Sequence, residues 1–85
     1  MNQMQKEELR RLVRRWMAER AALSFNAGSV HRGVSREISC TEPEVEDALT
    51  LLSGMGQLDA THSSLGATLY YKITASGILA EERNL

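Results

Sequence analysis

The hydrophobic pattern changes its period once along this chain of 85 residues. Up to about Leu52, apolar residues recur at steps of three and four, which places them on one face of an α-helix. After Gly56 they alternate with polar residues, as in a half-buried β-strand. Two separate cores would each fall below about 50 residues, which is too short for a stable domain. We therefore expect one α+β domain over residues 1–85, with helices first and strands after them.

Three helices are expected before the change of period. The first spans about residues 3–22, where one face is apolar and neither Gly nor Pro interrupts the run. That face consists of Leu9, Leu12, Val13, Trp16, Met17 and Ala21. We expect Trp16 to anchor the core, and Met17 and Met55 to fill gaps in it.

The second helix is expected over about residues 27–39. Asn26 is a preferred N-cap residue, because its side chain can accept a hydrogen bond from a first-turn amide. Val30, Val34 and Ile38 then recur every four residues and form a single buried line. The turn that follows is short, so this helix and the next form a helix-turn-helix.

A capping box marks the start of the third helix. Thr41 is the N-cap and Glu44 stands three residues later. Pro43 lies in the first turn, where a backbone N–H has no partner within the helix, so its missing N–H costs no hydrogen bond. Either Gly54 or Gly56 is expected to end this helix. Its inner face consists of Val45, Ala48, Leu49 and Leu52.

A β-hairpin and a short helix are expected after the third helix. Residues 58–63 and 69–73 alternate apolar with polar side chains, and Ser, Leu and Gly between them indicate a short loop. Thr74 is expected to cap a last helix that runs to about Arg83. This helix offers Ile78 and Leu79 to the core.

Two sequence stretches resemble the winged helix-turn-helix superfamily of small bacterial and phage regulators. The leucine-rich run 45–52, followed by Gly56 and Leu58, resembles the third helix and strand entry of these proteins. Residues 71–77, Tyr-Lys-Ile-Thr-Ala-Ser-Gly, resemble their second wing strand and its exit. The resemblance implies a three-helix core, a C-terminal two-stranded wing and a short final helix. It identifies no individual family.

The net charge of −1 conceals an uneven distribution of charge. Residues 1–36 hold eight basic and three acidic residues, a net of +5, whereas residues 37–85 hold two basic and eight acidic residues, a net of −6. Such an asymmetry is typical of a surface for nucleic acid or for a partner of complementary charge.

The resemblance implies that the third helix enters the major groove of DNA and that the wing touches the backbone. The outward positions of this helix are Glu42, Glu46, Asp47, Thr50 and Ser53, with no Lys or Arg among them. Carboxylates repel phosphates, so we expect them to limit non-specific binding. We expect phosphate contacts from Ser29, Arg32, Ser35 and Arg36 of the second helix and from Lys72 of the wing. Thr50 and Ser53 would then lie near base edges. The predicted function is a regulatory module that binds double-stranded DNA.

Three alternatives remain open for the charged residues. The arginines can be solvated or paired locally, as Arg32 with Glu37. On the first helix, four-residue spacing lets Glu7 pair with Arg11 and Arg15 with Glu19.

A basic first helix can also meet an acidic helix of a second copy, in a homodimer. The residues of that interface would be Arg10, Arg11, Arg14, Arg15, Glu46 and Asp47. Finally, the acidic third helix or the basic first helix can dock onto another protein without any nucleic acid.

The sequence shows no signature of a metal site, a cofactor site or an active site. Cys40, His31 and His62 are the only soft metal ligands, and their spacing matches no zinc pattern. We expect Cys40 to be a small apolar residue of the turn, with Glu42 raising the pKa of its thiol. No phosphate-binding loop, nucleophile elbow or His-Glu-x-x-His motif occurs, so we expect neither a cofactor nor an enzyme.

The apolar stretches are too short for a membrane span or a signal-peptide core. A single cysteine allows no disulfide within the chain, which is typical of a reducing compartment. We therefore expect a cytoplasmic protein that makes no contact with a membrane.

Overall fold

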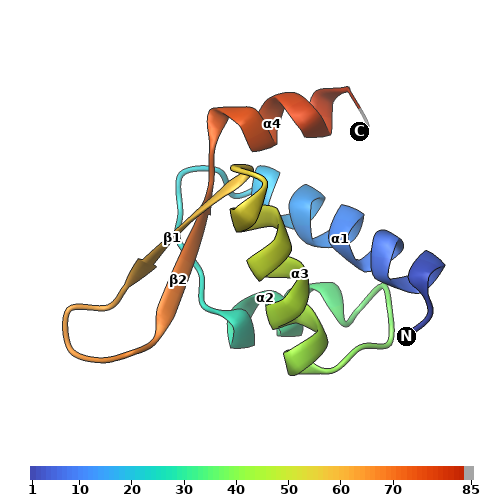
Figure 1. Cartoon of the computed structure of the whole chain (residues 1–85), viewed down its shortest axis with the longest axis horizontal. Helices are drawn as coiled ribbons and strands as arrows, with labels where there is room; N and C mark the ends of the chain where they lie inside the picture. The colour runs from blue at the N-terminus through green and yellow to red at the C-terminus, as the bar shows by residue number, and fades with distance from the viewer. Residues whose placement is uncertain (84–85) are drawn as a thin grey trace.

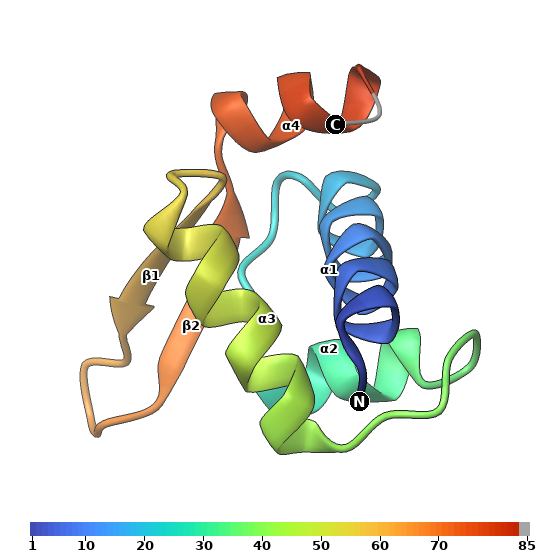
Figure 2. The same ribbon diagram turned by 45° about the vertical axis from the view of Figure 1, so that its right-hand side comes forward.

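The computed structural model describes residues 1–83. Its elements in chain order are α1 (Gln3–Ala18), α2 (Ala27–Val34), α3 (Glu42–Gly54), β1 (Leu58–His62), β2 (Leu69–Ile73) and α4 (Ala75–Glu82). Helices α1 to α3 pack together, the hairpin extends from one side of them, and α4 lies across the end of α1 (Figures 1 and 2). The α+β class, the three-helix core, the hairpin and the short final helix are confirmed.

Helices α1 and α2 are shorter than the periodicity predicts. The first ends at Ala18 instead of residue 22, because the chain turns to bring Phe25 beside the hairpin. The second ends at Val34 instead of residue 39. There the hydroxyl of Ser35 donates to the carbonyl oxygen of Arg32, at 3.3 Å, and this local bond competes with continued helix.

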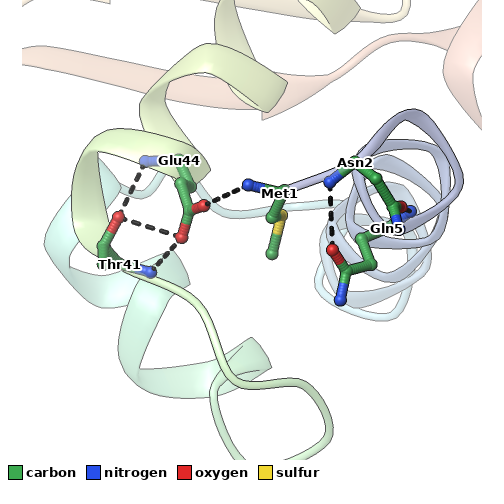
Figure 3. Close-up of polar contacts among 5 residues, drawn as sticks. All are labelled: Met1, Asn2, Gln5, Thr41 and Glu44. Atoms are coloured by element: carbon green, nitrogen blue, oxygen red, sulfur yellow. Dashed lines mark hydrogen bonds and ion pairs between the residues drawn. The ribbon is translucent and has the colours of Figure 1, made fainter.

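The N-terminus of α3 is fixed by the predicted capping box. The backbone N–H of Thr41 donates to Glu44 Oε1 at 2.8 Å, and the N–H of Glu44 donates back to Thr41 Oγ1 at 3.3 Å (Figure 3). The Thr41 N–H bond, together with a bond from Thr41 Oγ1 to Glu44 Oε1 at 3.0 Å, stabilises the ionised carboxyl and keeps the pKa of Glu44 below its usual value. Asn2 and Gln5 form a second capping box at the start of α1, which the sequence analysis did not identify.

The core lies where the three helices meet the hairpin. Its largest fully buried side chains are Leu9, Val13, Met17, Val30, Val34, Val45, Leu49 and Leu58. The predicted inner faces of the helices are therefore confirmed, with Trp16 and Ile38 half-buried against this cluster. Two predictions are wrong: Met55 is 56% exposed and Leu79 is 48% exposed, so neither fills the core.

The hairpin is antiparallel and pairs Leu58 with Ile73 and Ala60 with Tyr71. The linker between α1 and α2 adds a single bridge on the other side of β2. There the N–H of Phe25 donates to the carbonyl of Tyr71 and the N–H of Tyr71 donates to that of Phe25, both at 2.8 Å. This bridge holds the hairpin beside the N-terminus of α2.

Helix α4 packs on the rest of the chain through the buried Gly77 and Ala80 and the half-buried Ile78. Gly77 is buried against the backbone of Gln57, and Arg14 of α1 donates from Nε to Glu81 Oε1 at 3.0 Å. Arg14 is 5% exposed, so the prediction that it belongs to a solvated basic face is wrong. No helix in the described part of the chain is long and apolar enough to cross a membrane.

Candidate nucleic-acid interface

The exposed face of α2 carries the side chains predicted to contact phosphates. Arg32 and Arg36 are exposed, and the guanidinium of Arg32 donates to Ser29 Oγ at 3.2 Å. Among residues 1–83, no carboxylate lies within 4.0 Å of either guanidinium. The local pair of Arg32 with Glu37 does not form, because Glu37 binds Arg15 instead. Both arginines are therefore open to an anion from outside.

The basic residues of α1 are mostly paired. The carboxylates of Glu8, Glu81 and Glu37 bind Arg11, Arg14 and Arg15 respectively, and Glu19 binds Arg20 just beyond the end of the helix. The predicted four-residue pairs of Glu7 with Arg11 and of Arg15 with Glu19 are therefore wrong. Arg10 has no carboxylate partner in the part of the chain that the structure describes. Most of the positive charge of the first helix is thus compensated within the molecule.

A groove runs between α2, α3 and the hairpin. Glu42, Glu46 and Thr50 line it from α3, opposite Asn26 and Gly28 of α2. The remaining lining comes from the hairpin residues Ala67, Thr68, Leu69 and Tyr71. Two carboxylates therefore stand between Arg32 and the hairpin, and they interrupt the positive surface.

The other two predicted outward positions of α3 lie elsewhere. Asp47 lines a hollow on the α1 side of the helix, together with Lys6 and Arg10. The hydroxyl of Ser53 is buried and has no hydrogen-bond partner within residues 1–83. The prediction that Ser53 points outward is wrong, since its hydroxyl is turned into the protein.

Solved structures share this arrangement. ZitR from Lactococcus lactis, a mutant in its apo form, is 10% identical, with a TM-score of 0.65 over 92% of this chain and 57% of that chain. The adhesin competence repressor AdcR from Streptococcus pyogenes is 13% identical, with a TM-score of 0.60 over 98% of this chain and 54% of that chain. The chain has the winged helix-turn-helix fold. At these identities the likeness concerns the fold alone, and this winged helix spans little more than half the length of either protein. No protein-family model and no curated protein matches the sequence.

The wing of this winged helix carries little net charge on its outer face. Lys72 stands directly opposite Asp59 in the register of the two strands, and both are exposed. Alternation along β2 places Lys72 on the opposite face from Tyr71, which is 4% exposed and packs in the core. Lys72 therefore lies on the side of the wing that faces away from the groove beside α3.

Cys40 lies in the turn between the two helices of the helix-turn-helix, half-buried against the core as predicted. Burial raises the pKa of its thiol, and the carboxylate of Glu44, not that of Glu42, raises it further. The carbonyl of Cys40 accepts a hydrogen bond from His31 Nε2 at 2.9 Å. Within residues 1–83 no cluster of three or more His, Cys, Asp or Glu side chains could hold a metal ion.

Proposed function

We propose that this winged helix is a DNA-binding regulatory module that contacts phosphates mainly through α2. The observation that carries the proposal is the exposed pair Arg32 and Arg36, which no carboxylate of residues 1–83 neutralises. Cations that release counterions from the phosphate backbone supply most of the affinity of such proteins. The fold shared with AdcR, which is named as a repressor, supports the same proposal.

The remaining contacts follow from the position of each side chain. Ser29 lies beside Arg32 on α2, where its hydroxyl accepts from that arginine and can donate to a phosphate oxygen. Ser35 and Arg36 follow the end of α2, and the hydroxyl of Ser35 can donate to a phosphate only if it gives up its bond to the Arg32 carbonyl. Lys72 contributes from the outer face of the wing. Thr50 is exposed in the groove and is the α3 side chain nearest to base edges in this proposal, since the hydroxyl of Ser53 is buried. The carboxylates of Glu42 and Glu46 repel phosphates and keep non-specific binding weak.

A titration of fluorescently labelled random duplex DNA at low salt tests the proposal. The double variant R32A/R36A should bind at least about tenfold more weakly, because two phosphate contacts are lost. The slope of log affinity against log salt should decrease by about 2, one for each contact. R83A is the matched control, because Arg83 is exposed at the end of α4, away from α2, and has no carboxylate partner among residues 1–83. If the parent protein binds no duplex below physiological ionic strength, the DNA proposal is rejected.

A protein partner is the second candidate function, and Glu42 and Glu46 favour it. Both carboxylates stand in the middle of the surface that joins α2 to the wing. In a DNA-binding protein, the double variant E42Q/E46Q should bind duplex DNA more tightly, since a repulsion is removed. If neither the parent nor this variant binds DNA, the acidic groove is better explained as the docking site of a basic protein segment.

We also propose that the chain forms a homodimer through α1 and α3. Arg10 has no carboxylate partner among residues 1–83 and lies beside the exposed apolar side chains of Leu51 and Met55, in the two hollows between these helices. A two-fold axis would set the basic residues of one copy against the acidic residues of the other. The interface would comprise Arg10, Arg11, Arg15 and Asp47, without the buried Arg14 and without Glu46, which lines the groove between α2, α3 and the hairpin.

Sedimentation at low and high salt tests the homodimer. We expect a dimer that weakens as salt screens the charges. The variant M55E should dissociate it, because a carboxylate would replace an apolar contact. The matched control is L65E in the wing loop, where Leu65 is 99% exposed and far along the hairpin from α1. A monomer at every salt concentration would contradict the proposed interface.

A further inference from the structure

A second groove lies between the C-terminal end of α1 and the exposed face of α2. Its walls carry Arg20 and Trp16 from the α1 side, and Ser29, Arg32 and Arg36 from α2. Guanidinium groups donate hydrogen bonds and accept none. The two carboxylates at its rim, Glu19 and Glu37, are already bound to Arg20 and Arg15. Three arginines therefore line the groove with two carboxylates that already bind arginine, so the groove keeps a positive charge that attracts an anion.

The aromatic wall of this groove is held rigidly. The guanidinium carbon of Arg20 lies 4.1 Å from the centre of the Trp16 ring, and Phe25 packs edge-on with ring centres 4.7 Å apart. The indole packs directly on Gly33, where a Cβ would lie 2.2 Å from Trp16 Nε1. Arg20 NH1 also donates to the carbonyl oxygen of Trp16 at 3.1 Å. These contacts fix the position of the Arg20 charge beside α2 and leave other N–H groups of its guanidinium for a ligand.

We propose that this groove binds phosphates of the DNA backbone and that Arg20 is a third phosphate-binding arginine beside Arg32 and Arg36. The proposal rests on the proposed function and adds the path of the strand. At the N-terminus of α2, the carboxylate of Glu42 lies close to Gly28 and repels phosphates from the α3 side. On the α1 side the three arginines attract them. The backbone therefore crosses α2 toward the end of α1 instead of following α3.

The single tryptophan of the chain makes this groove directly observable. Excitation of Trp16 during a titration with unlabelled duplex DNA at low salt should change its emission, with saturation at the same DNA concentration as the anisotropy of labelled duplex. R20Q should lower the affinity for duplex about threefold to tenfold and decrease the salt slope by about 1. R20K keeps the charge over the indole, so its salt slope should remain near that of the parent.

The control variant is R83Q, because Arg83 is exposed at the end of α4 and unpaired among residues 1–83. Its affinity and salt slope should equal those of the parent. If duplex DNA binds, but the emission of Trp16 does not change and R20Q binds DNA like the parent, this groove is excluded as a phosphate site while the proposed function stands. If no duplex binds at all, both fail. If inorganic phosphate at matched ionic strength changes the emission and duplex DNA does not, the groove binds a small anion and the assignment to a DNA backbone is overturned.

Discussion

Replacing Gly77 with alanine is expected to lower the free energy of unfolding by about 2 kcal/mol, although alanine favours helix over glycine. A Cβ at this position in α4 would lie 2.2 Å from the carbonyl oxygen of Gln57 and 2.6 Å from Ile73 Cγ1. The carbonyl cannot move freely, because it accepts the N–H of Thr74 at 3.0 Å and so fixes the exit of the hairpin. Relief of the clash must displace α4 or break this bond.

Thermal and urea unfolding, followed by circular dichroism, measure this effect. A loss of about 2 kcal/mol corresponds to a fall in Tm of roughly 10 °C for a domain of this size. Gly54 provides the matched control, because it is also helical and a Cβ there would meet nothing within 4 Å. G54A should be neutral or stabilising by up to about 1 kcal/mol. Equal effects of G77A and G54A would show that Gly77 is not held by this close approach.

The elements that the sequence predicted best have strong local signals. Thr41 and Glu44 are three residues apart, so the start of α3 depends on neighbours in the sequence. The two strands of the hairpin followed from the alternation of apolar and polar residues, although in β1 only Leu58 is buried and Ala60 and His62 are exposed. Helix ends were predicted less well. At the end of α2 the hydroxyl of Ser35 donates to the carbonyl of Arg32, and the spacing of apolar residues gives no indication of such a bond.

The contacts that the sequence could not show join residues far apart in the chain. Arg14 and Glu81 are 67 positions apart, so no pattern of spacing relates them, and Arg14 was assigned to the basic surface of its neighbours. The bridge between Phe25 and Tyr71 depends in the same way on the folded chain. The close packing of Trp16 on Gly33 could be found only once the arrangement of α1 and α2 was known.

The candidate site could be predicted only in part, because some of its features belong to single helices and others depend on contacts between residues far apart in the chain. Charge counting along the chain identified Arg32 and Arg36 and the acidic character of α3, because these are properties of single helices. Which cations remain unpaired could be decided only in three dimensions: Glu37 binds Arg15 and leaves Arg32 free. Arg20 was missed because its charge was counted with the basic first half and its place beside α2 was unknown. A rule that searches for tryptophan and arginine four residues apart would have found it.

Removal of the Glu81 carboxylate is expected to destabilise the protein by about 2 kcal/mol. Its partner Arg14 is 5% exposed, so E81A leaves a guanidinium charge that is shielded from water and has lost its counterion. Breaking a fully buried pair in this way costs about 3–5 kcal/mol. A smaller value is expected here because the Glu81 side chain keeps 24% of its exposure, so water can reach the site. Urea unfolding of E81A against the parent measures the loss.

The double variant R14M/E81L separates the loss of a charge pair from a general loosening of α4. Replacement of both charges by apolar side chains of similar size removes the desolvation cost as well as the attraction, so it is often close to neutral. We expect R14M/E81L to lie within about 1 kcal/mol of the parent, and therefore to be more stable than E81A. E82A is the surface control, because Glu82 is exposed on the same turn of α4, and it should change stability by less than about 0.5 kcal/mol. If E81A and E82A unfold alike, the pair contributes nothing measurable, and α4 is held to the core by the buried Gly77 and Ala80 and by Ile78.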